Sequence, residues 1–183
     1  MATWTQATAI PTGQLITSAW MNTTVAAINF LGAGSNLQGK DLALLRQTTN
    51  QTGLTASTYN VINWTIADFD VASGFSVGVS ASRYIAKAAG KYRIQAHMYM
   101  AAGGTNATQN IVFRLYKNGT SQSGFTHSVP NRTASIAGHY ATPVWLISLA
   151  ANDYIELYLN ADWTAATGSN TLNSTLSIEW VGA

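Results

Sequence analysis

The feature that most constrains this chain is the rhythm of its second half, where short runs of alternating apolar and polar residues end in tight turns. Clear examples lie at residues 84–94, 111–119 and 146–157. Alternation with a period of two places apolar side chains on one face of an extended chain, and Asn118-Gly119 is a typical hairpin turn. Because no helical stretch interrupts these runs, they favour a β-sandwich or barrel over an alternating βα fold. The sequence therefore predicts an all-β domain.

The pattern predicts a set of strands whose purely apolar faces form the core between two sheets. The strands are expected at Leu42–Thr48, Tyr59–Ile66, Arg83–Ala86, Lys91–Met100, Ile111–Tyr116, Gly124–Ser128, His139–Leu149, Tyr154–Asn160 and Leu172–Val181. The apolar faces assigned to the core are Tyr92, Ile94, Ala96, Met98 and Met100; Ile111, Phe113 and Leu115; and Leu176, Ile178 and Trp180. A chain of 183 residues can hold one such domain and a short appendage.

Three motifs follow one another in a recognisable order. They are Gly90-Lys91-Tyr92 at the start of a strand, the hairpin Leu115-Tyr116-Lys117-Asn118-Gly119, and a second hairpin in which Leu149, Asp153 and Ile155 are spaced Leu-x-x-x-Asp-x-Ile. In this order they resemble the jelly-roll domain of the tumour-necrosis-factor and complement C1q globular-head superfamily. The resemblance covers roughly residues 41–183, and it implies a jelly-roll β-sandwich that assembles as a homotrimer.

The polar faces of the strands carry more aromatic surface than a face exposed to solvent needs. Tyr99, Tyr116, Tyr154 and Tyr158 lie there, and Trp145 is a further candidate. A ring with a polar tip suits a subunit interface, where the ring is buried and the hydroxyl finds a partner. We therefore predict that Tyr99, Tyr116 and Tyr158 line the trimer interface. The alternative is that these tyrosines are simply half-exposed strand residues.

The N-terminal segment is expected to form a short amphipathic helix. Thr17 or Ser18 can cap a helix that begins at Ala19, and Gly32 and Gly34 end it. Its apolar stripe comprises Trp20, Thr24, Ala27, Ile28 and Leu31. A helix of three to four turns is marginal alone in water, so the stripe is expected to dock on another surface.

This opening is similar to the N-terminal segment of many tailed-phage structural proteins. The similarity rests on Trp4, on Ile16-Thr17-Ser18-Ala19-Trp20-Met21-Asn22 and on Ile28-Asn29-Phe30-Leu31, whereas Val25-Ala26-Ala27 replaces a charged stretch. The resemblance implies that residues 1–34 anchor the protein to a particle, that 35–40 are a linker and that 41–183 form the jelly roll. The anchor residues it points to are Trp4, Trp20, Ile28 and Leu31. The alternative is an ordinary helix that packs on the end of the sandwich itself.

Composition argues against several partners. Only 9% of the residues are charged, the formal net charge is +2 and cysteine is absent. The basic residues are scattered, whereas binding to nucleic acid by phosphate neutralisation needs them clustered among aromatic residues. The N-terminus lacks the basic and apolar regions of a secretory signal, and no apolar run approaches the roughly 20 residues of a membrane helix. We therefore expect neither nucleic-acid binding nor membrane insertion.

Candidate catalytic or metal-binding groups are few. His97, His127 and His139 lie in separate expected strands without a metal-ligand spacing. Asp68 and Asp70 project to one side if their segment is extended, which could serve a calcium ion or glycoside hydrolysis, but a solvated turn is the plainer interpretation. The sequence predicts no catalytic residues, no cofactor and no metal, and the chain is not expected to be an enzyme.

These observations predict a structural protein of the virion surface in a tailed bacteriophage. It would be a trimeric head fibre, capsid decoration or tail-fibre knob, attached to other virion proteins through residues 1–34, with host-surface glycans as candidate ligands. The alternative is a free trimeric carbohydrate-binding or adhesion module. Its expected ligand-binding loops are 101–109, 122–133 and 161–171, with Trp163 presented to the ligand.

Overall fold

The computed structural model describes residues 41–102, 108–133, 137–163, 165–167 and 174–182. The chain divides into two compact units, Met1–Gln38 and Gly39–Ala183, and all described residues belong to the second. The predicted N-terminal helix, with the anchor residues Trp4, Trp20, Ile28 and Leu31, lies outside the described residues.

The described part of the chain is built from β-strands. They are β1 (Leu42–Gln47), β2 (Gln51–Leu54), β3 (Asn60–Val61), β4 (Ile66–Asp70), β5 (Arg83–Ile85), β6 (Gly90–Met100), β7 (Thr108–Lys117), β8 (Thr120–Thr133), β9 (Gly138–Ala141), β10 (Trp145–Leu149), β11 (Tyr154–Ala161), β12 (Ala165–Thr167) and β13 (Ser174–Gly182). The all-β class predicted from the sequence is thus confirmed.

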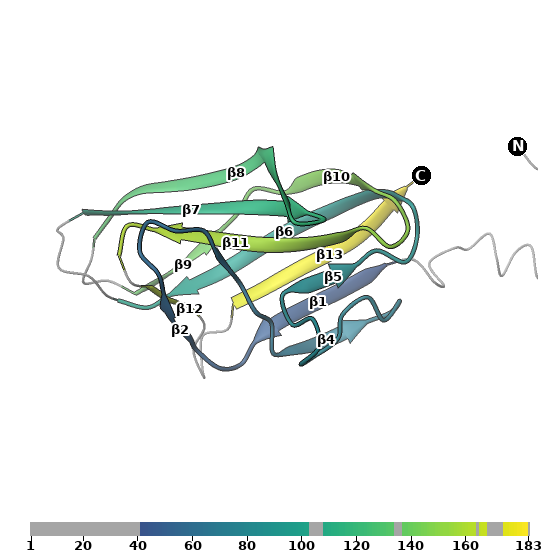
Figure 1. Ribbon diagram of the computed structural model, residues 1–183, viewed down its shortest axis with the longest axis horizontal. Helices are drawn as coiled ribbons and strands as arrows, with labels where there is room; N and C mark the ends of the chain where they lie inside the picture. The colour runs from purple at the N-terminus through teal and green to yellow at the C-terminus, as the bar shows by residue number, and fades with distance from the viewer. Residues whose placement is uncertain (1–40, 103–107, 134–136, 164, 168–173, 183) are drawn as a thin grey trace, which may run out of the picture. The chain divides into compact units, whose positions relative to one another are not determined.

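The strands form two antiparallel sheets. The eight-stranded sheet has the order β2-β12-β6-β13-β1-β4, and β9 and β10 also pair with β6. The five-stranded sheet has the order β3-β11-β7-β8, and β5 pairs with β11. Figure 1 shows β7 beside β11 in one layer and β1 beside β13 in the other, so the domain is a two-layer sandwich.

The core lies between the two sheets and consists of the faces that the alternation predicted. In β6, β7 and β13 the predicted residues Tyr92, Ile94, Ala96, Met98, Met100, Ile111, Phe113, Leu115, Leu176 and Ile178 are all buried. Trp180, assigned to the same core, is half-buried and packs against it. Burial of a large apolar side chain contributes about 1.5–3 kcal/mol, so these three strands contribute a substantial part of the core.

Two strands predicted as continuous are interrupted. The expected strand His139–Leu149 splits into β9 and β10 around Pro143, which has no N–H to give to the pairing with β6. The expected strand Tyr59–Ile66 is wrong for another reason, because this segment changes sheets. The Ile62 N–H donates to Leu157 O of the five-stranded sheet at 2.9 Å, and the Thr65 N–H donates to Arg46 O of the eight-stranded sheet at 2.9 Å.

The two central hairpin turns are held together by Asp153. Its carboxylate accepts hydrogen bonds from Asn118 Nδ2 at 2.7 Å and from the Ala150 N–H at 2.7 Å, and it pairs with Lys117 Nζ at 2.8 Å. Asn118 also accepts the Tyr154 N–H at 2.8 Å. The Asp-containing hairpin motif of the sequence is therefore a clasp between β7–β8 and β10–β11.

Replacing Asp153 with alanine is expected to lower the free energy of unfolding by about 1–2 kcal/mol at pH 7, since several hydrogen bonds to a charged group are lost. The ion pair with Lys117, then Asn118 and the Ala150 N–H, lower the pKa of Asp153 from 3.8 to about 2. The stabilisation that the Asp153 carboxylate gives to the folded state is therefore complete above pH 4 and disappears as the pH falls through 2. Urea unfolding of both proteins at pH 7, 4 and 2.5 measures this, and parallel pH profiles would contradict it.

Candidate functional site

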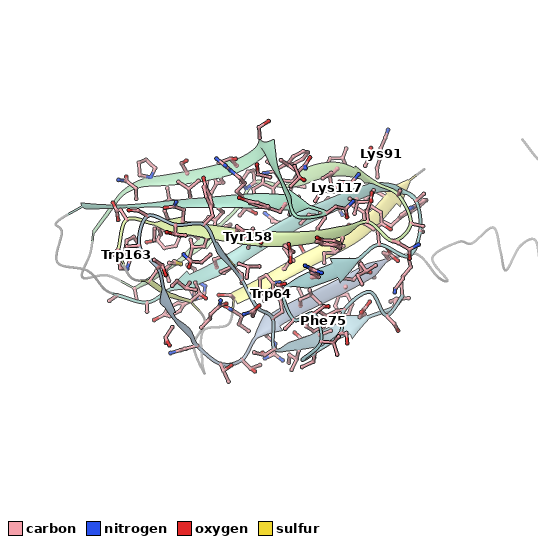
Figure 2. The ribbon with its side chains drawn as sticks, viewed as in Figure 1. Trp64, Phe75, Lys91, Lys117, Tyr158 and Trp163 are labelled. Atoms are coloured by element: carbon pink, nitrogen blue, oxygen red, sulfur yellow. The ribbon has the colours of Figure 1, made fainter. Side chains whose placement is uncertain are left out.

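A surface of tyrosine and arginine side chains covers the outward face of the five-stranded sheet. We define this Tyr–Arg surface by Tyr59, Arg83, Arg114, Tyr116, Tyr154 and Tyr158. Alternation along β7 and β11 explains it, because the inward residues on either side, such as Leu115 and Leu157, are fully buried. Figure 2 shows Tyr158 on β11, in the middle of this sheet.

The rings of the Tyr–Arg surface contact one another across strands. Tyr116 and Tyr158 stack with centroids 3.9 Å apart and an interplanar angle of 30°, and Tyr59 lies 6.4 Å from Tyr116. The Arg114 guanidinium carbon lies 4.5 Å from the centre of the Tyr59 ring, within the range of a cation–π contact. Stacking therefore covers one ring face of Tyr116 and one of Tyr158.

A buried carboxylate supports one end of this surface. Glu156 is buried, and it accepts hydrogen bonds from Ser82 Oγ and Arg83 Nε, both at 2.9 Å. The hydrogen bond that Arg83 donates to Glu156 raises the pKa of Arg83, whose guanidinium also lies 4.2 Å from the centre of the Tyr154 ring. Burial, followed by the charge of Glu156, raises the pKa of Tyr158. Tyr158 therefore keeps a neutral hydroxyl on the same surface as the Arg83 guanidinium, which suits a polar ligand.

The three tyrosines predicted at the trimer interface do not lie on one surface. Tyr116 and Tyr158 belong to the Tyr–Arg surface, whereas Tyr99 lies on β6 in the eight-stranded sheet, where its ring centre is 5.3 Å from that of His139. The alternation shows which residues of a strand face outward, but it does not show to which of the two sheets the strand belongs. Their role at an interface therefore stays a prediction, but they cannot share a single patch of one chain.

The outward face of the eight-stranded sheet carries exposed apolar residues on β1, β4, β10 and β13 and at the position before β10. We call these residues the apolar rim: Leu42, Phe69, Val144, Leu146 and Val181. In the pairing of neighbouring strands, Leu42 lies opposite Glu179, Glu179 opposite Arg93, and Arg93 opposite Leu146. Arg93 and Glu179 form an ion pair. The sequence did not single these residues out, although the alternation around Leu146 between buried Trp145 and Ile147 placed it outward.

The three histidines lie in separate strands, two of them in paired strands of one sheet and the third in the other sheet. His97 and His139 lie in β6 and β9 of the eight-stranded sheet, and His127 lies in β8 of the other sheet. Within the described residues no group of three or more His, Cys, Asp or Glu side chains could hold a metal ion. These histidines therefore form no common site within one chain.

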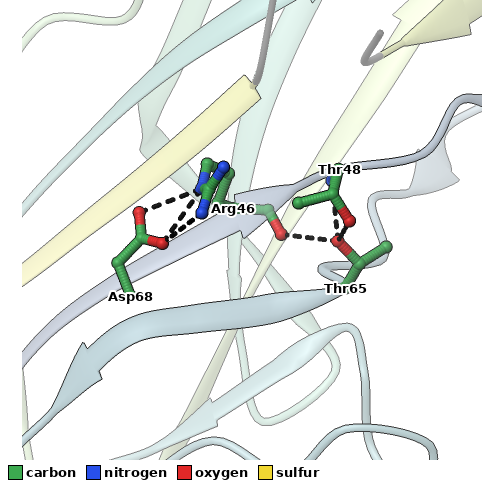
Figure 3. Close-up of polar contacts among 4 residues, drawn as sticks. All are labelled: Arg46, Thr48, Thr65 and Asp68. Atoms are coloured by element: carbon green, nitrogen blue, oxygen red, sulfur yellow. Dashed lines mark hydrogen bonds and ion pairs between the residues drawn. The ribbon is translucent and has the colours of Figure 1, made fainter. Parts of the chain in front are cut away.

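Asp68 and Asp70 do not project to one side, and their segment is not a turn but strand β4. A bulge in the pairing of β1 with β4 turns Asp68 outward, where its carboxylate accepts from Arg46 Nε at 3.0 Å and Nη2 at 2.5 Å. Figure 3 shows this pair beside the hydrogen-bonded hydroxyls of Thr48 and Thr65, 2.8 Å apart. Asp70 pairs with inward-facing Ala43, so the two carboxylates cannot act on one ligand.

Two expectations about ligand-binding loops are wrong. Trp163 is only 6% exposed and belongs to the core, so it is not presented to a ligand. Figure 2 shows it at the end of the sandwich opposite Lys117. The expected loop 122–133 is part of strand β8. An open pocket of about 610 Å³ lies instead between residues 63–65 and 77–83, where Arg83 connects it to the Tyr–Arg surface.

Comparison with solved structures supports the fold. The globular domain of zebrafish complement 1qA is similar, with a TM-score of 0.54 and 10% identity, over 78% of this chain and 98% of that one. Murine APRIL is also similar, with a TM-score of 0.50 and 13% identity, over 76% of this chain and 98% of that one. No protein-family model and no curated protein matches the sequence. No helix in the described part of the chain could span a bilayer. The described domain therefore has the jelly-roll β-sandwich fold seen in C1q and tumour-necrosis-factor-like proteins.

Proposed function

We propose that this chain is a structural protein of the virion surface in a tailed bacteriophage, a trimer attached to the particle through residues 1–34. The carrying observation is the combination of a separate N-terminal unit, Met1–Gln38, with a jelly-roll sandwich that presents a binding surface. The phage-like sequence of the N-terminal unit supports attachment to other virion proteins. The neutral surface, with 9% charged residues in the chain, suits a protein exposed to wide changes of salt.

The proposed trimer is formed by the outward face of the eight-stranded sheet. In a closed ring of three, one patch of each copy packs on a different patch of the next. The apolar rim provides two such patches, because Leu42 and Phe69 lie at the β1–β4 edge and Leu146 lies on β10 beyond β6. This arrangement places Tyr99 at the interface. It leaves Tyr116 and Tyr158 on the outside of the trimer.

The Tyr–Arg surface then faces away from the trimer axis and is the proposed contact with host-surface glycans. Sugars offer hydroxyls that can hydrogen-bond to guanidinium and phenol groups. The same surface favours the second candidate function, a free trimeric carbohydrate-binding module. The two functions differ in one respect, namely whether the chain is part of a particle.

Deleting residues 1–34 is expected to remove the protein from virus particles while leaving a folded, trimeric domain. The full-length chain should be found in gradient-purified particles by mass spectrometry, and the deletion variant only in the soluble fraction. Trp20→Ala is expected to reduce incorporation. Asn29→Ala is the matched control, because 100° per residue places Asn29 opposite Trp20 on the predicted helix.

Two outcomes would contradict this proposal. Absence of the full-length chain from particles, together with binding to glycans in solution, would favour the free carbohydrate-binding module. Incorporation of the deletion variant at the level of the full-length chain would show that residues 1–34 are not the anchor.

A further inference from the structure

A cluster of polar side chains is buried between the sheets where β1 begins. We call Asp41, Asp70 and Tyr84, with the neighbouring Tyr92, the Asp–Tyr cluster. Asp41 immediately precedes β1, Asp70 ends β4, Tyr84 lies in β5 of the opposite sheet and Tyr92 lies in β6. Asp41 is 1% exposed and Tyr84 is fully buried, which is unusual for a carboxylate and a phenol.

Strand register brings the two carboxylates together. Asp70 pairs with Ala43, and Asp41 lies two residues before Ala43 on the same inward face, so the aspartates are diagonal neighbours about 7–8 Å apart at Cα. The tip of Tyr84 reaches the same place, because a Cβ on Gly74 would be 2.5 Å from Tyr84 Cζ. Asp70 Oδ2 accepts the Phe75 N–H at 2.8 Å, so its carboxylate folds over this same turn, in which Figure 2 labels Phe75.

Three oxygen atoms of the cluster are buried without a hydrogen-bond partner. They are Asp41 Oδ1, Asp70 Oδ1 and Tyr84 Oη. The other oxygen of Asp41 is satisfied, since it accepts the Lys87 N–H at 2.7 Å and contacts the Tyr92 hydroxyl. None of the ion pairs among the described residues includes Asp41 or Asp70. Leaving buried polar atoms unsatisfied costs about 1–3 kcal/mol each, and more for charged groups.

The three oxygens interact electrostatically. Burial first, and then the negative charge of Asp41 and Asp70, raise the pKa of Tyr84. The phenol oxygen of Tyr84 can offer a lone pair to a cation. Two carboxylates and one neutral oxygen are the ligand types that hard cations prefer, and a charge of +2 would balance the pair.

We propose that Asp41 Oδ1, Asp70 Oδ1 and Tyr84 Oη form part of a buried calcium site, which links β1 and β4 of one sheet to β5 of the other. Calcium accepts irregular sets of six to eight oxygens, so backbone carbonyls and water can complete its shell, whereas magnesium requires a near-octahedral arrangement. A bound ion would stabilise the folded state by mass action. This site is independent of trimer formation and of attachment to a particle.

Terbium, which replaces calcium and emits when nearby aromatic rings are excited, tests the site in the full-length chain. After removal of divalent ions, Tb³⁺ is expected to give sensitised emission that saturates at one ion per chain and is displaced by Ca²⁺. Asp41→Asn should weaken binding roughly tenfold or more. Asp68→Asn is the matched control, because Asp68 pairs with Arg46 on the outward face and should leave Tb³⁺ binding unchanged.

A second measurement keeps the proposal falsifiable if Asp41→Asn does not fold. Calcium is expected to raise the melting temperature of the unaltered chain, and Tyr84→Phe, which removes only the hydroxyl, should reduce that increase. The proposal would be overturned if the unaltered chain gave no saturable Tb³⁺ emission. It would also be overturned if Asp68→Asn abolished the emission as fully as Asp41→Asn does. A melting temperature that does not change with calcium would also overturn the proposal. An ordered water would then be the partner of the three oxygens.

Discussion

Replacing Leu146 with aspartate is expected to convert the trimer into monomers that remain folded. Leu146 is 56% exposed on the isolated chain, so a carboxylate there does not disturb the core. In the proposed trimer the same carboxylate would be buried against the apolar patch of the next copy, and its cross-strand neighbour Arg93 is already paired with Glu179. Such a buried charge costs several kcal/mol, and about 4 kcal/mol corresponds to roughly a thousandfold weaker association. Sedimentation velocity at several micromolar concentrations measures the loss, and circular dichroism checks the fold.

Tyr158→Ala is the control for the other face of the sandwich. Because Tyr158 lies on the Tyr–Arg surface, its truncation should leave the trimer intact. Dissociation of the trimer by Tyr158→Ala, with an intact Leu146→Asp trimer, would place the interface on the five-stranded sheet and would contradict the proposed arrangement.

Replacing Gly90 with alanine is expected to prevent folding, or to destabilise the domain by roughly 3 kcal/mol or more. Gly90 begins β6 with φ of +150°, a conformation that residues with a Cβ rarely adopt. A Cβ there would lie 2.3 Å from Trp180 Nε1 and 2.4 Å from Gly182 O. The second atom belongs to the backbone of β13, which pairs with β6, so this carbonyl cannot move without disturbing the central pairing.

Gly124→Ala is the matched control, because a Cβ at Gly124 would meet nothing within 4 Å. Its stability should remain within about 1 kcal/mol of the parent, since only the glycine's conformational freedom changes. Urea unfolding of the three proteins provides the comparison. A midpoint for Gly90→Ala equal to that of the parent would show that the structure around Trp180 relaxes more easily than its packing indicates.

The sequence predicted the core well because period-two alternation records which residues face inward. In β6 and β7 this pattern is uninterrupted, and Ile94 and Phe113 are fully buried as expected. Alternation does not record which sheet a strand joins. Tyr99 and Tyr116 both face outward, yet they lie on opposite sides of the sandwich, so an interface containing both could not be checked from the pattern alone.

Other features of the site depend on contacts between residues far apart in the chain. The bulge opposite Leu44 and Leu45 places Asp68 and Asp70 on opposite faces of the sheet. The local sequence of β4 does not predict this bulge. The Asp–Tyr cluster unites positions 41, 70 and 84 only because β1, β4 and β5 meet at one end of the sandwich. Asp41 directly follows the expected polar linker 35–40, and only the packing shows that it is buried.

Sedimentation equilibrium of the unaltered chain at micromolar concentration most directly tests the central claim that three copies of the chain assemble. The proposed assembly predicts a mass three times the 19.5 kDa of one chain. A well-folded species of 19.5 kDa at these concentrations would contradict it.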